Sequence, residues 1–138
     1  MHIITVSAVL FQRLDGTVLT VRKRGTDMFM LPGGKPEPGE DPRGTAVREF
    51  SEELGVDLDE ARLRYLGDFR CAAANEPGHE VLAHVYEHPF VPVDQPRAEI
   101  ERLEWVDPAA EYRSPTGATM APLNTDHVFP ALVRERTS

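Results

Sequence analysis

The chain has 138 residues, a net charge of −8 and 41% hydrophobic residues. Its length and apolar content suit one domain with its own core, and we expect residues 1–138 to form a single domain. The acidic balance excludes the extended basic surface that a nucleic-acid polymer requires, because such binding rests on Lys and Arg neutralising phosphates. A small phosphorylated molecule held through a cation is compatible with this charge.

Cysteine usage and hydropathy indicate the compartment. Cys71 is the only cysteine, so no intramolecular disulfide can form, and we expect it to serve as a small apolar filler. The N-terminal stretch MHIITVSAVLF lacks the basic start and the apolar run of a signal peptide, and no run of 18 apolar residues occurs. We therefore expect a soluble, cytoplasmic protein with no membrane contact.

The first residues predict a β-hairpin. Ile3 to Phe11 is apolar and rich in β-branched residues, Asp15-Gly16 is a turn signal, and Thr17 to Val21 resumes an apolar run. The second strand leads into a cationic cluster, the densest of an acidic chain. Its Arg22 and Arg24 are candidates for contacting substrate phosphates, and a solvated strand end is an equal alternative.

A glycine pair and a helix follow. Phe29 to Leu31 predicts a brief strand that ends near Gly33 and Gly34, where the absence of side chains lets the backbone approach a ligand closely.

Asp41 before Pro42 predicts a helix start. Gly55 predicts its end. At 100° per residue the helix gathers two stripes, one of Ala46, Val47, Phe50 and Leu54 and one of Glu49, Glu52 and Glu53.

Three carboxylates on one side of a helix repel one another. Arg48 offsets part of this charge, but a single guanidinium does not balance three acids together with Glu40 upstream. A hard divalent cation with oxygen ligands, Mg²⁺ or Mn²⁺, would balance them. The alternative is a solvated acidic face, which is the usual meaning of a Glu-rich helix.

The spacing from Gly34 to Gly55 identifies a family. Glu40 follows Gly34 after five residues, Arg48-Glu49 follows after seven more, and Glu52-Glu53 stands just before Leu54-Gly55. This pattern resembles the Nudix box of the Nudix hydrolase family, with Phe50 standing where the family usually has an aliphatic residue. The resemblance implies hydrolysis of a diphosphate linkage in a nucleoside diphosphate joined to another group, with bound Mg²⁺ or Mn²⁺.

The resemblance also implies roles for the matched residues, all of them catalytic or metal-binding. Glu52 and Glu53 would be metal ligands, the Gly33 carbonyl a further ligand, and Glu49 a ligand or the base that activates water. Arg48 would orient these acids. Which glutamate takes the proton stays open. Gly34 is a candidate for contacting the substrate.

The rest of the chain predicts two more strands, a loop, a last strand and a helix. The strands are expected within 63–71 and 80–90, with a turn between them, and the last strand ends at Trp105-Val106. In similar families a further metal-binding Glu sits on a loop shortly before such a Trp. Glu99 matches that placement better than Glu101, and a charged loop rim is an equal alternative.

The closing helix should begin near Asn124 or Thr125, after a turn-rich stretch at 107–121. Asn124 would by default be the N-cap. MutT-type nucleoside triphosphatases, which the chain resembles in length and in the Pro-x-Asn before this helix, use an Asn here to read the base edge.

The order of elements predicts an α+β protein with a mixed sheet packed between helices. The Nudix resemblance implies the same α/β/α sandwich, and it admits a homodimer. Markers of ADP-ribose and dinucleoside polyphosphate enzymes are missing at Cys71 and at 72–74. The leading hypothesis is therefore a metal-dependent pyrophosphohydrolase of nucleoside triphosphates or other small nucleoside diphosphate derivatives, including damaged nucleotides. The alternative is a non-catalytic module that senses a nucleotide or nucleotide sugar, although its usual mark is a decayed box.

Overall fold

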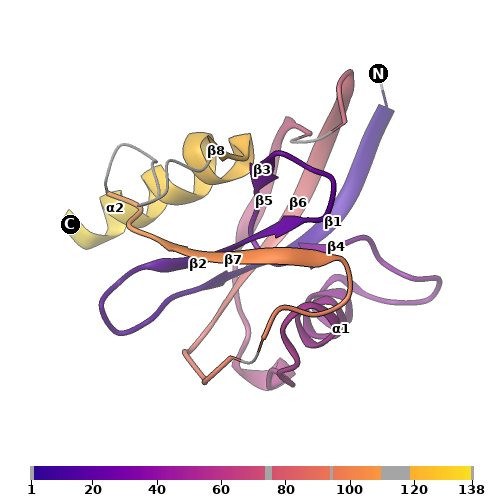
Figure 1. Cartoon of the computed structure of the whole chain (residues 1–138). Coiled ribbons are helices and arrows are strands. Elements are labelled where there is room, and N and C mark those ends of the chain that lie inside the picture. The colour runs from indigo at the N-terminus through magenta and orange to yellow at the C-terminus, as the bar shows by residue number, and fades with distance from the viewer. Residues whose placement is uncertain (1, 74–75, 94, 110–118, 138) are drawn as a thin grey trace.

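The computed structural model describes residues 2–73, 76–93, 95–109 and 119–137, with side chains as far as Arg134. Two long strands, two helices and several shorter elements make up this part of the chain (Figure 1). In chain order they are β1 (His2–Phe11), β2 (Val18–Lys23), β3 (Met28–Phe29), β4 (Gly33–Gly34), α1 (Pro42–Leu54), η1 (Glu60–Arg62), β5 (Arg64–Ala72), β6 (His79–His88), β7 (Ile100–Val106), β8 (Thr119–Met120), η2 (Leu123–Val128) and α2 (Phe129–Thr137).

The main sheet is mixed. Its strands lie in the order β4-β1-β6-β5, with β1 and β6 parallel along their whole length and the other two pairings antiparallel. Strand β2 pairs antiparallel with β7, and β3 pairs parallel with β8. Figure 1 shows these strands between α1 on one side and α2 on the other. The predicted α+β architecture with a mixed sheet between helices is confirmed.

Alternation along β1 builds a core on each side of the main sheet. Ala8 and Leu10 belong to a cluster that includes Phe129 of α2. Val9 and Phe11 belong to a second cluster that includes Phe50 of α1. Because successive side chains of a strand point to opposite faces, one apolar run covers both cores.

The predicted boundaries of α1 are confirmed. The Asp41 carboxylate accepts a hydrogen bond from the Gly44 N–H at 2.8 Å, and Pro42 occupies the first helical position, where an N–H would have no partner. Gly55 ends the helix with φ of 68°, in the left-handed region that favours glycine. Phe50 is fully buried and its ring lies 4.9 Å from that of Phe11, centroid to centroid. This contact fixes the helix to the sheet.

The predicted opening hairpin is wrong beyond its turn. The turn itself forms, because Arg13 and Thr17 are joined by a backbone hydrogen bond and Gln12 bridges to Val18. The strands then diverge, since β1 takes β4 and β6 as neighbours while β2 takes β7. Pairing with β6 and β7 buries both strands more completely than a two-stranded hairpin would.

The end of the chain also differs from expectation. The strand that contains Trp105 is not the last, because β8 follows it. The closing helical region begins with the π-helical segment η2, and Pro122 occupies the cap position with no side-chain hydrogen bond. Asn124 is therefore not an N-cap. Its side chain turns inward, where a backbone carbonyl accepts its hydrogen bond.

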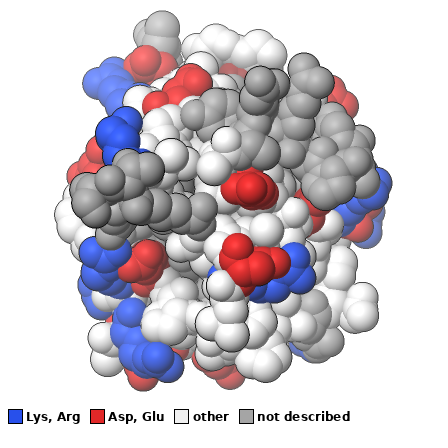
Figure 2. Space-filling view, turned by 90° about the vertical axis from the view of Figure 1, so that its left-hand side faces the viewer, with Lys and Arg blue, Asp and Glu red and all other residues white. Residues whose placement is uncertain are grey.

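The helices and the surface add two observations. No helix within the described ranges is long and apolar enough to cross a membrane. Figure 2 shows one face of the molecule, and on its described part Lys and Arg side chains stand beside Asp and Glu side chains instead of forming a continuous basic patch.

Candidate functional site

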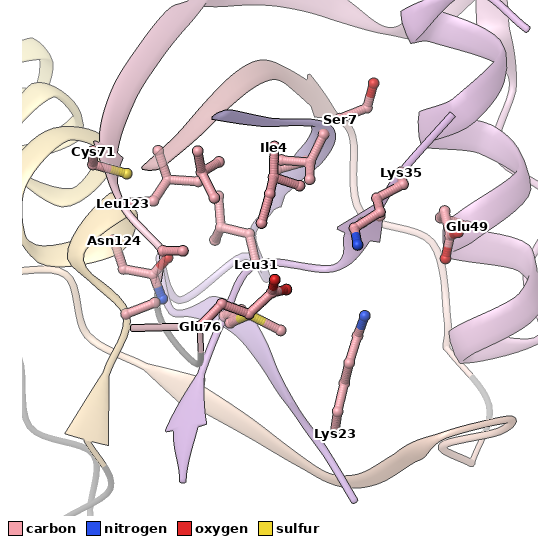
Figure 3. Close-up of a pocket in the computed structure, with 18 of the residues that line it drawn as sticks. Ile4, Ser7, Lys23, Leu31, Lys35, Glu49, Cys71, Glu76, Leu123 and Asn124 are labelled. Atoms are coloured by element: carbon pink, nitrogen blue, oxygen red, sulfur yellow. The ribbon is translucent and has the colours of Figure 1, made fainter. Parts of the chain in front are cut away.

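A cavity of about 570 Å³ lies between α1 and η2. Side chains from β1, β2, β5 and the loops around β4 and β7 also contribute to its wall. Figure 3 shows Glu49, Lys35 and Lys23 around one end of this cavity and Asn124, Cys71 and Leu123 around the other. We call these the acidic end and the amide end. Apolar side chains, among them Ile4 and Leu31, line the space between them.

Glu53 is the most buried acid near the acidic end, with 1% of its surface exposed. Its Oε1 accepts a hydrogen bond from the Gly33 N–H at 3.0 Å, whereas its Oε2 is buried without a hydrogen-bond partner. Burial raises the pKa of Glu53 to about 8, and the Gly33 N–H and the Lys23 ammonium act in the opposite direction. A buried carboxylate oxygen without a partner is costly, so either a proton or a bound cation would stabilise this group.

Gly33 and Gly34 are glycines because other protein groups already occupy the space that a side chain would need. A Cβ at Gly33 would lie 2.0 Å from the Ser7 carbonyl oxygen of β1. A Cβ at Gly34 would lie 2.5 Å from the carboxyl carbon of Glu49. The backbone at Gly33 and Gly34 therefore makes the expected close approach, but it approaches β1 and Glu49 of α1. It lets Glu49 reach the cavity wall beside Gly34.

Arg48 donates hydrogen bonds to three glutamates and forms an ion pair with a fourth, Glu37, at 3.3 Å. Its Nε and Nη2 donate to the two oxygens of Glu40 at 2.7 and 2.9 Å, and its Nη1 donates to Glu49 at 3.0 Å and to Glu52 at 3.3 Å. The hydrogen bonds from Arg48 lower the pKa of Glu40 to about 2. The guanidinium is a rigid planar fork of donors, so it fixes these carboxylates in direction as well as in charge.

The acids of the box therefore lie in different environments. Burial raises the pKa of Glu49 although Arg48 lowers it. Glu52 keeps 52% of its side chain exposed and does not line the cavity. Within the described residues no three His, Cys, Asp or Glu side chains lie close enough to hold a metal ion as they stand. The donors nevertheless suit a hard cation, because the Glu53 Oε2 lacks a partner and the ligands at hand are carboxylate oxygens.

The two candidate loop acids have different partners. Glu99 lines the cavity and its carboxylate lies 3.2 Å from the Lys23 ammonium. Glu101 pairs with Arg22 and does not line the cavity. The carbonyl of Glu99 also accepts a hydrogen bond from the Arg24 N–H at 2.8 Å, which ties this loop to the end of β2.

In the cationic cluster at 22–24, the residue that lines the cavity is not one of the two that the sequence indicated. Arg22 and Arg24 are not among the residues that line the cavity, and Lys23 is. The signal for Lys23 was present, because Leu19 and Val21 of β2 face the α1 core and the next residue in that alternation is Lys23. Lys35, the second lysine at the acidic end, was not predicted as a site residue.

Asn124 lies at the amide end with no exposed surface. Its Nδ2 donates to the Phe29 carbonyl oxygen at 3.3 Å and approaches the Met120 sulfur at 3.8 Å. Its Oδ1 is buried and has no hydrogen-bond partner. Cys71 lines the same end, and burial raises the pKa of its thiol. The small-filler role expected for Cys71 suits this place.

The chain is similar to curated proteins over part of its length. The chain is 39% identical over 74 residues to human diphosphoinositol polyphosphate phosphohydrolase 3-alpha, which is 54% of this chain and 43% of that protein. It is 45% identical over 58 residues to the bovine 3-beta protein, which is 42% of this chain and 34% of that one. The chain thus spans less than half the length of these curated relatives.

Solved structures match over nearly the whole chain. The E. coli ORF135 protein has a TM-score of 0.70 at 26% identity, covering 99% of this chain and 92% of that one. The MutT protein from Methanosarcina mazei Go1 has a TM-score of 0.76 at 22% identity, covering 99% and 97%. The NUDIX domain family matches residues 1–126. Fold, box and family match agree, and the chain belongs to the NUDIX domain family.

Proposed function

We propose that this chain hydrolyses a diphosphate bond in nucleoside triphosphates or other small nucleoside diphosphate derivatives, with Mg²⁺ or Mn²⁺ as the required cation. One observation carries the proposal. The buried Glu53 carboxylate has an oxygen without a partner, and it lies beside a cavity that two lysines also line. A carboxyl oxygen that a cation can satisfy, near cationic side chains, is the arrangement that a metal-bound polyphosphate needs.

The acids on α1 and the loops would share the metal. We assign Glu53 and Glu49 as ligands, with Glu52, Glu99 and the Gly33 carbonyl as further ligands. A bound cation of this kind neutralises charge on phosphate oxygens and lowers the pKa of water. Glu49 accepts a hydrogen bond from Arg48, which holds its carboxylate in a fixed direction and leaves its second oxygen to ligate or to accept a proton.

Arg48 is a positioning residue in this proposal. It pairs with Glu37, Glu40, Glu49 and Glu52, and these carboxylates neutralise its charge. Glu40 in turn is held by two Arg48 nitrogens and by the Thr45 hydroxyl at 2.8 Å, which ties the guanidinium to the start of the helix. Losing this guanidinium would leave four acids without this partner at once.

The substrate would lie along the cavity. Lys23 and Lys35 favour phosphates at the acidic end, with Gly34 offering backbone there, and Asn124 favours the base at the amide end. The proposed phosphate contacts of Arg22 and Arg24 would need a shift from their present places outside the wall. Two lysines suit a nucleotide better than a diphosphoinositol polyphosphate, whose dense phosphates would need more cations.

The test is release of pyrophosphate or phosphate across a panel of nucleoside triphosphates, nucleoside diphosphate derivatives and a diphosphoinositol polyphosphate. We expect turnover of one or more nucleotides that requires Mg²⁺ or Mn²⁺ and stops with a chelator. Turnover of the inositol compound alone would overturn the substrate class. Nucleotide binding without any turnover would instead support the non-catalytic sensing module.

A further inference from the structure

The segment that leads into β7 is fixed to the end of α1. The Arg97 N–H donates a hydrogen bond to the Glu53 carbonyl oxygen at 2.8 Å. This carbonyl belongs to the last turn of α1, where carbonyl groups have no partner within the helix. The segment and the helix end therefore lie side by side (Figure 1).

The Arg97 side chain lies against the same helix end. A Cβ at Gly55, the C-cap of α1, would lie 2.6 Å from the Arg97 Cζ. The last turn of α1 contains no basic residue, so Arg97 brings the positive charge that a helix C-terminus favours. Gly55 is therefore needed twice, for its left-handed backbone and for the space that the guanidinium takes.

A tight turn with an unusual backbone follows. The Arg97 carbonyl oxygen accepts a hydrogen bond from the Ile100 N–H at 3.0 Å, which closes a turn over residues 97–100. Inside it, Ala98 has φ of 54° and is the only non-glycine among the described residues with a positive φ. A side chain is disfavoured in this left-handed region, which glycine adopts readily. The surrounding hydrogen bonds therefore hold Ala98 in a strained conformation.

Glu99 is the residue that this turn presents to the cavity. Its carbonyl oxygen accepts the Arg24 N–H at 2.8 Å, so the loop is anchored on this side as well. Its carboxylate lines the cavity and lies 3.2 Å from the Lys23 ammonium. Glu53 is at the other end of the same contacts, because its own carbonyl oxygen accepts the Arg97 N–H. One acid of the helix and one acid of the loop are thus held in a fixed relation.

Stability alone does not call for an alanine at this position, because glycine would adopt the same backbone without strain. Strain of this kind persists where the surrounding structure holds it, and it gathers at sites where geometry matters. A divalent cation that is shared by carboxylates needs their oxygens at nearly fixed positions. The turn meets that need for Glu99.

We propose that Arg97 and Ala98 are positioning residues, whose turn docks on the end of α1 and sets the Glu99 carboxylate against Glu53 for a shared divalent cation. The inference rests on the proposed function, because Glu53 and Glu99 are proposed ligands there. It adds no ligand to that set. It assigns the residues that hold a loop ligand and a helix ligand together.

The experiment measures Mn²⁺ binding to the full chain without nucleotide, from the electron paramagnetic resonance signal of free Mn²⁺. Ala98→Val places a β-branched residue at a positive φ, where such residues are outliers. We expect this variant to bind Mn²⁺ about tenfold more weakly. Ala98→Gly fits the same backbone and should keep the dissociation constant within about twofold of the unsubstituted value.

The same substitution is then made in the Glu99→Gln chain. This background should by itself bind Mn²⁺ about tenfold more weakly, since it lacks a proposed ligand charge. Ala98→Val should have almost no further effect on Mn²⁺ binding there, because the turn acts through the Glu99 carboxylate. Urea unfolding of chelator-treated protein gives the contrasting measurement. Its midpoint should fall equally in both backgrounds, because strain in the turn does not depend on the carboxylate.

Arg97→Ala is a second variant that decides the matter if Ala98→Val does not fold. It changes an exposed residue and keeps the backbone N–H that donates to Glu53. Removing a positive charge near acids would by itself strengthen the binding of a cation. We expect weaker Mn²⁺ binding instead, and only in the chain that retains Glu99. The sign of the change therefore separates positioning from a simple charge effect.

Three results would overturn the inference. The first is equal weakening by Ala98→Val in both backgrounds, which would mean that the turn serves only the fold. The second is Mn²⁺ binding by Ala98→Val and Arg97→Ala that is as tight as in the unsubstituted chain. The third is unchanged Mn²⁺ binding in Glu99→Gln, which would remove the acid through which the turn acts. None of them depends on turnover, so metal-dependent hydrolysis in the nucleotide panel would leave the proposed function standing.

Discussion

The acidic end and the amide end of the cavity are built in opposite ways. At the acidic end, Arg48 and the glutamates it holds come from one helix and the loop just before it, and the guanidinium satisfies most of them. At the amide end, Asn124 depends on Phe29 and Met120, which are distant in sequence or lie on another element. The arrangement of the α1 acids thus depends mostly on one continuous segment, whereas that of Asn124 depends on a tertiary assembly.

Each end has one buried side-chain oxygen without a hydrogen-bond partner, and the two oxygens favour different kinds of partner. Glu53 Oε2 belongs to an acid and favours a cation or a proton, whereas Asn124 Oδ1 belongs to a neutral amide and favours an N–H. A single elongated ligand with a metal-bound phosphate at one end and a hydrogen-bond donor at the other would satisfy both. The following predictions separate the two ends.

Glu53→Gln should have the largest effect. Gln keeps the shape and can still accept the Gly33 N–H, but it removes a proposed ligand charge, so turnover with saturating Mg²⁺ should fall more than about 100-fold. The binding of nucleoside 5′-monophosphates, measured by calorimetry, should keep its preference among bases, because Asn124 is untouched. Glu101→Gln is the matched control. Turnover within a few fold of the unsubstituted chain would rule out the role of Glu53.

The pH dependence of stability should show the same buried acid without metal. Glu53 has a pKa of about 8 when folded and an ordinary value of 4.5 when unfolded. Between these values the folded chain holds a proton that the unfolded chain has lost, so stability falls as pH rises from about 4.5 to 8, by at most about 1.4 kcal/mol per unit. Below 4.5 both states hold the proton and this group contributes no slope.

Chelator-treated protein, unfolded in urea at several pH values, provides the measurement. Glu53→Gln should flatten the decline, because the amide does not titrate. Glu40 has the opposite sign, since its lowered pKa gives stability that is lost as pH falls from 4.5 toward about 2. An identical slope in the Gln variant would assign the decline to other groups.

Glu99→Gln and Glu101→Gln should separate the two loop acids. Glu99 faces the cavity and Lys23, so its variant should lose about tenfold in kcat/KM. Glu101 lies outside the wall against Arg22, and its variant should stay near the unsubstituted value. Steady-state kinetics on one nucleotide measures both. Equal small effects would make Glu99 a rim residue, and the acidic end would then consist of α1 alone.

Asn124→Ser should have the smallest effect on turnover and act only at the amide end. The smaller side chain leaves space in a fully buried position, so we expect a loss of about 0.5–3 kcal/mol in stability. Purine against pyrimidine discrimination, taken as a ratio of kcat/KM values, should fall while the Mg²⁺ dependence stays. An unchanged ratio would move base recognition away from Asn124, with Glu76 the next residue to vary.

The sequence alone determined the features that depend on neighbours in the chain. Asp41, Pro42 and Gly55 set the limits of α1, because capping and left-handed backbone are local matters. The period of 3.6 placed Phe50 inward and the acids of α1 together, and the spacing of the box predicted the family. The alternation in β1 was also readable, although not which strands would lie beside it.

Only the tertiary structure decided which groups are buried and what they meet. Glu53 and Glu52 are adjacent in sequence, yet one is enclosed against Gly33 and the other stays exposed. Strand β1 pairs with β4 and β6 while β2 pairs with β7, although the turn between β1 and β2 forms as the sequence predicts. Asn124 binds a carbonyl 95 positions away instead of capping its helix. The burial of Glu53 and the partners of Asn124 and of the strands follow from packing between distant segments, which these local patterns do not encode.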